Sequence, residues 1–220
     1  MTARQYCAMT DRPPSHTDSR FFLLRHGQSL ANVQGLIASS PAVARDGFGL
    51  TDTGREQVRR WVGSARASGV LPAVVHVISS PLLRARETAD VAAGLLGATV
   101  RTDPRLTERS FGELELTSDD NYEQVWAVDR TDPTHERWGV ESVASILGRT
   151  AALLKDLHAF DGAGTFVLCT HGDVASTLIC ASSGLALTQH REVGALGNGE
   201  LRAISHRDIA RAIPPGARAV

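Results

Sequence analysis

The sequence predicts an α/β protein with three layers, in which a mostly parallel central sheet carries helices on both faces. Three short apolar runs, at residues 20–24, 73–79 and 165–170, are typical of buried strands, and helical segments separate them. Strands that alternate with helices are joined by crossovers, which makes neighbouring strands parallel. Each of the three runs also ends in residues that can bind an anion.

Local signals predict the remaining elements. Asp52 or Thr53 is expected to cap a helix that ends before Gly69. Ser80 is expected to cap a second helix, with Pro81 as its first residue, because proline is favoured at that position. The other expected elements are strands at 98–102 and 201–205 and helices near 122–128, 140–158 and 173–183.

The chain of 220 residues is long enough for one domain with a full core. Residues 1–19 contain Pro13-Pro14 and scattered Ser, Thr and Asp and lack the apolar stretch of a signal peptide, so they are predicted to be a disordered leader. The domain is expected over 20–206, with 116–140 as a variable, lid-like segment and 207–220 as a flexible tail.

Composition excludes several classes of protein. The formal net charge of −1 and pI of about 6.7 give no bulk attraction to nucleic acid or anionic membranes. Cys7, Cys169 and Cys180 are odd in number and unclustered, which argues against a disulfide framework and for a reducing compartment. Since no stretch is long and apolar enough to span a membrane, we expect a cytoplasmic protein. An exposed sheet edge could support a homodimer.

The ends of the three apolar runs indicate one shared anion site. The first run ends in Arg25-His26-Gly27, the third ends in His171-Gly172, and the second leads through Ser80 to Arg84. In a parallel sheet, ligands bind beyond the carboxyl ends of the strands, where these residues would meet.

The residue types at this edge suit a phosphate monoester. Arg25 and Arg84 can each clamp two oxygens, and Gly27 would let the backbone approach the ligand. His26 could attack phosphorus as a neutral imidazole and form a phosphohistidine. His171, if protonated, would stabilise negative charge on the equatorial oxygens. This scheme requires neither a metal nor a cofactor, so none is expected.

A proton donor for the leaving group is expected at Glu108, at the start of the irregular region. Its carboxyl group could protonate the leaving oxygen and then deprotonate the water that hydrolyses the phosphoenzyme. Glu113 and Glu115 are nearby alternatives, but only Glu108 lies in a Leu-x-Glu pattern.

These motifs resemble those of the histidine phosphatase superfamily, also called the phosphoglycerate-mutase-like family. The resemblance covers residues 21–205, and its pieces occur in the family's order. They are Leu24-Arg25-His26-Gly27 with Ser29 and Asn32, Leu50-Thr51 with Gly54 and Gln57, Ser80-Pro81-Leu82 with Arg84, Leu106-x-Glu108, Gly139-x-Glu141-Ser142 with Arg149, and His171-Gly172.

The resemblance implies that His26 is the phosphorylated nucleophile and Glu108 the general acid and base. It also implies that Arg25, Arg84 and His171 complete the phosphate pocket. The further residues expected to bind phosphate or to line the substrate side are Gly27, Ser29, Asn32 and Gly172. A small phosphorylated metabolite is the expected substrate, and a phosphoprotein stays open as an alternative.

The family contains mutases as well as phosphatases. In the family, phosphoglycerate mutases carry Arg, His and Tyr just after the catalytic Glu and, further on, a pair of arginines that binds the substrate carboxylate. Here Glu108 is followed by Arg109-Ser110-Phe111-Gly112, and residues 116–137 hold only two arginines, Arg130 and Arg137. Asp119, Asp120 and Glu123 would repel a highly anionic substrate, so hydrolysis is favoured over mutase activity. A non-catalytic phosphate-binding domain is a third reading, and it would predict the loss of catalytic residues that are all present.

Overall fold

The structure is a computed structural model, and it describes residues 19–161, 163–207 and 209. Within these residues, five strands form one sheet in the order β3-β2-β4-β1-β5. Neighbours are parallel except β5, which runs antiparallel to β1. The strands are β1 (Arg20–Arg25), β2 (His76–Ser79), β3 (Val100–Thr102), β4 (Thr165–Thr170) and β5 (Leu201–Ile204).

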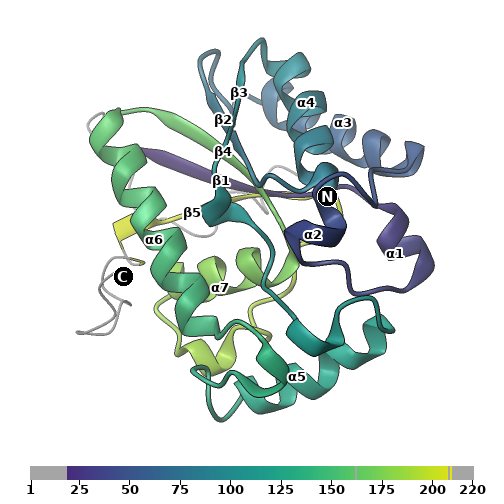
Figure 1. The fold of residues 1–220 in the computed structure, drawn as a ribbon. Coiled ribbons are helices and arrows are strands. Elements are labelled where there is room, and N and C mark those ends of the chain that lie inside the picture. The colour runs from purple at the N-terminus through teal and green to yellow at the C-terminus, as the bar shows by residue number, and fades with distance from the viewer. Residues whose placement is uncertain (1–18, 162, 208, 210–220) are drawn as a thin grey trace.

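Helices cover both faces of this sheet, so the predicted three-layer α/β fold is confirmed (Figure 1). Side chains of β1 alternate between two cores: Phe21 packs on the side of α6 and α7, and Phe22 on the side of α3 and α4. β4 is buried along its whole length, as expected for a central parallel strand. The helices are α1 (Leu30–Gln34), α2 (Pro41–Ala44), α3 (Asp52–Ala67), α4 (Leu83–Leu96), α5 (Tyr122–Asp129), α6 (Val143–Phe160) and α7 (Gly172–Ser182).

Two predicted helix starts were wrong. α4 begins at Leu83 with Leu82 at its cap position, so Ser80 does not cap it. The Ser80 hydroxyl accepts from the N–H of Leu82 at 3.3 Å and also contacts His171. At α3 the cap is Thr51, whose hydroxyl accepts a hydrogen bond from the N–H of Gly54. In both places several adjacent residues could cap equally well, and the contacts of the folded chain decide between them.

Strand and helix boundaries shift elsewhere by a few residues, while their order is as predicted. β2 begins at His76 rather than at residue 73, and β3 at Val100 rather than 98. His76 is therefore not a core residue in mid-strand: it opens the strand and its half-exposed ring stacks on Phe166. The helix expected near 122–128 is confirmed as α5.

Just outside each end of the predicted domain, 20–206, a described residue packs against the fold. Ser19 is buried, and its hydroxyl donates a hydrogen bond to the carbonyl oxygen of Asp161. Ile209 is buried in the core beneath α6 and α7. The rest of the expected leader, 1–18, and of the expected tail, 208 and 210–220, lies outside the described residues.

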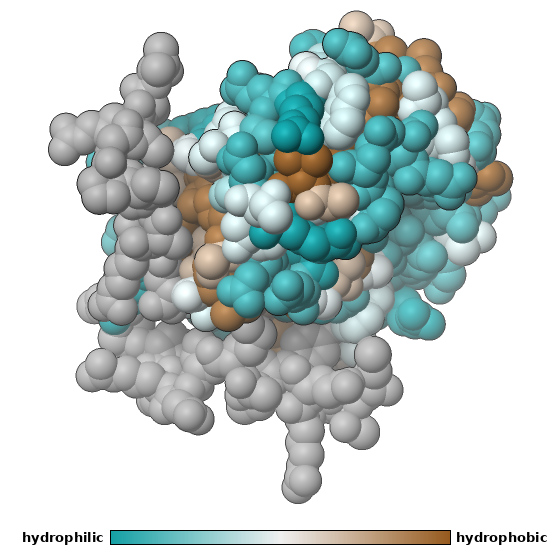
Figure 2. All heavy atoms as spheres, turned by 90° about the horizontal axis from the view of Figure 1, so that it is seen from below, coloured by the Kyte–Doolittle hydropathy of each residue, from teal (hydrophilic) through white to brown (hydrophobic). Residues whose placement is uncertain are grey.

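The surface seen from below is mainly hydrophilic, and hydrophobic side chains appear there in small, separate groups (Figure 2). Such scattered apolar groups are ordinary for a protein surface. Among the described residues, no helix is long and apolar enough to cross a membrane. The strands at the two edges of the sheet are β3 and β5. The homodimer expected from an exposed sheet edge stays a prediction.

Candidate active site

The backbone ladder brings the three strand ends together. Arg25, the last residue of β1, is paired with Thr170, the last residue of β4. One step further, the N–H of His26 donates to the carbonyl oxygen of Thr170 at 2.9 Å, and that of Ser80 to Cys169 at 2.9 Å. The residues predicted to meet at this edge therefore do so, because parallel pairing extends past the ends of the strands.

A pocket of about 220 Å³ opens at this edge. One part of its wall, here called the histidine side, consists of Arg25, His26, Arg84, Glu108 and Gly172. Another part, the aromatic side, consists of Phe111, Asp119, Tyr122, Trp126 and Arg191. The predicted residues Ser29 and Asn32 line it as well, whereas Gly27 and His171 do not.

The hydrogen bonds of His26 fix its tautomer. Nδ1 lies 2.8 Å from the carbonyl oxygen of Gly27, which can only accept, so Nδ1 carries the proton. Nε2 receives the Nε–H of Arg84 at 3.1 Å, so it presents a lone pair. Burial, followed by the charges of Arg84 and Arg25, holds the pKa of His26 well below its usual range. The imidazole is thus neutral, with its nucleophilic nitrogen beside two arginines.

Both arginines keep buried N–H groups without a hydrogen-bond partner. Arg25 donates from Nη1 to the carbonyl oxygen of Leu196 at 2.6 Å, but its Nε is unpaired. Nη1 of Arg84 is also unpaired, although the residue is 4% exposed. Burial lowers the pKa of both guanidinium groups. Because unpaired buried donors are costly, such a pair at the wall of a pocket is typical of an anion site.

His171 lies behind His26 and not at the wall of the pocket. The two ring centroids are 5.2 Å apart, and Nε2 of His171 is 2.7 Å from the hydroxyl of Ser80. Its Nδ1 is buried without a partner. Burial, followed by the charge of Arg84, holds the pKa of His171 well below its usual range. The lowered pKa favours the neutral form of His171 in this structure, and its protonation beside a phosphoryl group stays a prediction.

Glu108 is held by two backbone donors at the wall of the pocket. Oε1 accepts from the N–H of Arg109 at 2.9 Å, and Oε2 accepts from the N–H of Gly172 at 3.1 Å. Burial and then the charge of Asp173 raise the pKa of Glu108, and Arg84 opposes them. A carboxyl group with a raised pKa beside a candidate nucleophile can supply a proton.

The alternative acids are placed elsewhere. Both carboxylate oxygens of Glu115 hold the backbone and hydroxyl of Ser39, and one also accepts from the N–H of Ser40, so Glu115 fixes a loop. Glu113 is exposed and does not line the pocket. Of the three carboxylates in this region, only Glu108 contacts the pocket.

A close contact with α3 explains why position 27 is a glycine. A Cβ at Gly27 would overlap the backbone of Gly54, the third residue of α3, and a Cβ at Gly54 would overlap Gln28. The absent side chain therefore makes room for α3. The expectation that the Gly27 backbone approaches the ligand stays a prediction.

The expected substrate-side residues are tied to each other. Ser29 caps α1 and forms a capping box with Asn32, whose side-chain oxygen accepts from both the N–H and the hydroxyl of Ser29. Asn198, which the motifs did not include, donates to the carbonyl oxygen of His26 at 3.2 Å and to Asn32 at 3.4 Å. This link holds the loop after β1 in place.

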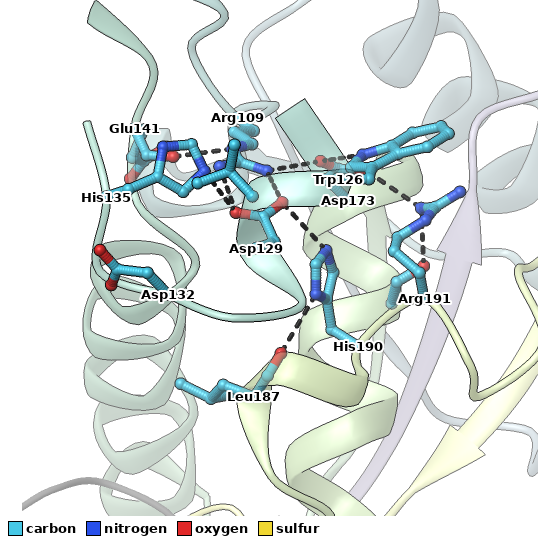
Figure 3. A network of polar contacts seen from close by, with 12 residues as sticks. Arg109, Trp126, Asp129, Asp132, His135, Glu141, Asp173, Leu187, His190 and Arg191 are labelled. Atoms are coloured by element: carbon cyan, nitrogen blue, oxygen red, sulfur yellow. Dashed lines mark hydrogen bonds and ion pairs between the residues drawn. The ribbon is translucent and has the colours of Figure 1, made fainter. Parts of the chain in front are cut away.

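A buried ionic network that the sequence analysis missed supports the aromatic side (Figure 3). Arg109 is fully buried and donates to both carboxylate oxygens of Asp129, at 2.6 and 3.0 Å, and to Asp173 at 3.3 Å. His135 contacts the same Asp129 carboxylate at 2.9 Å. Burial alone would raise the pKa of Asp173, but the charges of Arg109 and Arg191 outweigh it and lower that pKa. Asp173 is thus ionised beside Glu108.

The aromatic side itself is a stack of rings. Tyr122 stacks on Trp126 with centroids 5.2 Å apart, and Phe111 meets Tyr122 edge-on at 4.7 Å. The guanidinium of Arg191 lies 3.6 Å above the Trp126 ring, whose Nε1 donates to Asp173 at 3.1 Å. The position of Asp173 after His171-Gly172 was the one available signal for this network.

Comparison with known proteins identifies the family. The family model for the histidine phosphatase superfamily (branch 1) matches residues 21–213. The chain belongs to this superfamily. A probable phosphoglycerate mutase of Yersinia pestis (strain Pestoides F) is 30% identical over 180 residues, which cover 78% of this chain and 77% of the relative. A probable phosphoglycerate mutase of Erwinia tasmaniensis is 28% identical and covers 84% of each chain.

Solved structures of the superfamily share the fold. A mycobacterial glucosyl-3-phosphoglycerate phosphatase in complex with VO3 superposes with a TM-score of 0.69 at 27% identity, and covers 84% of this chain and 90% of that one. A phosphoserine phosphatase of Entamoeba histolytica in complex with phosphoserine gives 0.68 at 25% identity, covering 84% and 89%. Both phosphatases and proteins named as mutases are therefore similar to this chain.

Proposed function

We propose that this protein hydrolyses phosphomonoesters through a phosphohistidine intermediate on His26. The observation that carries the proposal is the joint geometry of the histidine side: an unprotonated Nε2 next to two arginines that keep unpaired buried N–H groups. Superfamily membership and the phosphatases among the similar structures support a phosphatase or phosphotransferase.

In the first step, the lone pair of His26 Nε2 attacks phosphorus and the bond from phosphorus to the ester oxygen breaks. Glu108, whose raised pKa favours the protonated form, gives its proton to the leaving oxygen. In the second step, the Glu108 carboxylate takes a proton from water, the resulting hydroxide attacks phosphorus, and the N–P bond breaks. Phosphate leaves, and both side chains return to their starting protonation states.

The charges of the histidine side match this chemistry. Arg25 and Arg84 together offset a phosphate dianion and donate to the oxygens that gain charge in the transition state. A dianion beside His26 would also raise the pKa of His171, because an opposite charge favours the protonated ring. His171 then adds a third cation behind the phosphoryl group.

Hydrolysis of 4-nitrophenyl phosphate in excess EDTA tests the proposal. Wild-type protein should turn over, and His26→Ala should lose at least about 10⁴-fold in kcat/KM while it keeps its circular dichroism spectrum. His76→Ala is the matched control, because His76 opens β2 at the other end of the strand and should leave turnover unchanged. Substantial turnover by His26→Ala would remove His26 as the nucleophile.

Phosphoryl transfer between phosphoglycerates is the second candidate, because the similar curated proteins carry the name phosphoglycerate mutase. The arginines of the irregular segment do not favour it. Arg130 pairs with Glu123 on the surface, Arg137 is exposed, and neither lines the pocket. A mutase would interconvert 2- and 3-phosphoglycerate faster than it released phosphate, whereas our proposal predicts release of phosphate alone.

A further inference from the structure

The charges of the aromatic side bear on which leaving group the pocket accepts. Two arginines and two aspartates lie there or directly behind it, and they pair with one another. Arg109 binds Asp129 and Asp173, and Arg191 binds Asp173 at 3.1 Å. Because these four charges cancel, the network offers no net positive charge to a second anionic group of a substrate.

Arg191 is the cation of this group that reaches the pocket, and it is already engaged. Its Nη1 donates to Asp173 at 3.1 Å and to the hydroxyl of Ser176 at 3.4 Å, and its plane covers the face of Trp126. Its Nε and Nη2 form no hydrogen bond with a described residue, but a substrate carboxylate bound to them would share the single charge of Arg191 with Asp173, which already offsets it.

Asp119 adds an uncompensated negative charge. It lines the pocket, is exposed, and forms no ion pair with any described residue. The other two carboxylates considered in the sequence analysis do not line the pocket: Asp120 is exposed, and Glu123 pairs with Arg130 at 2.7 Å. Of these three carboxylates, only Asp119 can therefore repel an anionic leaving group at the wall of the pocket.

The remaining polar groups of this wall suit hydroxyls. The hydroxyl of Tyr122 has no hydrogen bond within the described chain, and its pKa is raised, chiefly by burial and then by the charge of Glu108, so it remains a neutral donor. The side chain of Asn32 and the carboxylate of Asp119 can also bond to hydroxyls.

We propose that the leaving group of the physiological substrate is neutral and bears hydroxyl groups, as in a polyol or sugar phosphate, and carries no carboxylate or second phosphate. This inference rests on the proposed function for its phosphate subsite. The two arginines of the histidine side match the two charges of a phosphate monoester, and a further anionic group on the substrate would meet Asp119 and the neutral network.

Glycerol 3-phosphate and 3-phosphoglycerate are a matched pair for the test, because they differ only in a CH₂OH group that is replaced by a carboxylate. The dissociation constants of both compounds are measured by calorimetry with the His26→Ala protein, which does not depend on turnover. Glycerol 3-phosphate should bind at least about tenfold more tightly, the factor that about 1.4 kcal/mol of differential binding produces. Equal or tighter binding of 3-phosphoglycerate overturns the inference.

Two variants in the same background identify the source of the preference. Asp119→Asn removes a negative charge from the wall of the pocket, so the ratio of the two dissociation constants should shrink. The change should be only about threefold, because water partly screens this exposed charge. Glu123→Gln, which removes a carboxylate outside the pocket, should leave the ratio unchanged. An equal effect of both variants would show that the preference is not set at the wall of the pocket, and would contradict the inference.

Wild-type turnover separates this inference from the proposed function. If the wild-type protein does not hydrolyse aryl phosphate but the His26→Ala protein still prefers glycerol 3-phosphate, the proposed phosphatase activity is refuted and the inferred selectivity of the pocket is kept. Aryl phosphate hydrolysis together with a higher kcat/KM for 3-phosphoglycerate than for glycerol 3-phosphate supports the phosphatase and refutes the inference.

Discussion

The histidine side of the pocket is carried by strand ends and by the first residues of helices, whereas the aromatic side comes from α5 and the loops around it. On the histidine side, backbone ladders fix positions, and the donors of Arg25 and Arg84 stay unpaired. On the aromatic side, buried ion pairs and stacked rings fix positions, and the buried charges are paired. The histidine side thus keeps donors free for an incoming anion, whereas the buried charges of the aromatic side are already paired with one another.

The largest effect is expected at the unpaired arginine Arg84. Arg84→Ala should lower kcat/KM for aryl phosphate on the order of 10³–10⁴-fold, because a guanidinium that stabilises a transferring phosphoryl group contributes this much. Arg86→Ala is the control two residues along α4. Arg86 is half-exposed and pairs with Asp46 outside the pocket, so its loss should leave kcat/KM within about twofold. Similar losses in both variants would show that the effect of Arg84 does not come from its place at the wall of the pocket.

The second effect concerns stability and the aromatic side. Asp129→Asn should lower the free energy of unfolding by about 3–5 kcal/mol, because it removes the carboxylate that forms two short bonds with the buried Arg109 and leaves this cation only the 3.3 Å ion pair with Asp173. Glu123→Gln removes the exposed partner of Arg130 from the same helix and should cost less than about 1 kcal/mol. Urea denaturation measures both. A small change in Asp129→Asn would mean that the aromatic side does not depend on its ionic network.

The third effect sharpens the role of Glu108 between the two sides. Glu108→Gln keeps the shape of the side chain and one acceptor oxygen, for one of the two N–H groups of Arg109 and Gly172, but it cannot protonate a leaving oxygen. The value of kcat/KM should fall by about 10²-fold for glycerol 3-phosphate and by less than about tenfold for 4-nitrophenyl phosphate, whose phenolate needs little assistance. Equal losses on both substrates would assign the acid to another group.

The smallest effect is a pH dependence of stability. The pKa values of His26 and His171 are lowered in the fold, so the unfolded chain binds more protons at acid pH, and the free energy of unfolding falls as pH drops below about 6.5. Glu108, with its raised pKa, acts in the opposite sense. The free energy of unfolding should therefore fall between pH 7.5 and pH 5.5 by about 1 kcal/mol less in His26→Ala than in the wild type. An unchanged difference would contradict a neutral, buried His26.

The histidine side could be predicted from the sequence because its signals are local. Arg25, His26 and His171 directly follow buried apolar runs, and parallel strands share one edge for their carboxyl ends. The three-layer order of the elements follows from the same alternation. The prediction that failed there was a helix start: serine favours a cap position, but α4 begins three residues after Ser80, whose hydroxyl contacts His171 and accepts from the N–H of Leu82.

The aromatic side could not be predicted in this way because its contacts join distant parts of the chain. Arg109 meets Asp129 and Asp173, which are 20 and 64 positions away, and no periodic pattern connects them. Arg191 lies in a loop after α7 without any motif. Apart from the position of Asp173 after His171-Gly172, these side chains meet only through tertiary packing, which leaves no signal in a single sequence.

Trapping of the phosphoenzyme tests the central claim most directly. Glu108→Gln is mixed with 4-nitrophenyl phosphate and quenched in denaturant at alkaline pH, since the variant should form the intermediate and hydrolyse it slowly. Mass spectrometry should find the mass of one added phosphoryl group on the peptide that contains His26, and none in Glu108→Gln/His26→Ala. A phosphoryl group on a different residue, or release of nitrophenolate without any labelled protein, would contradict the account.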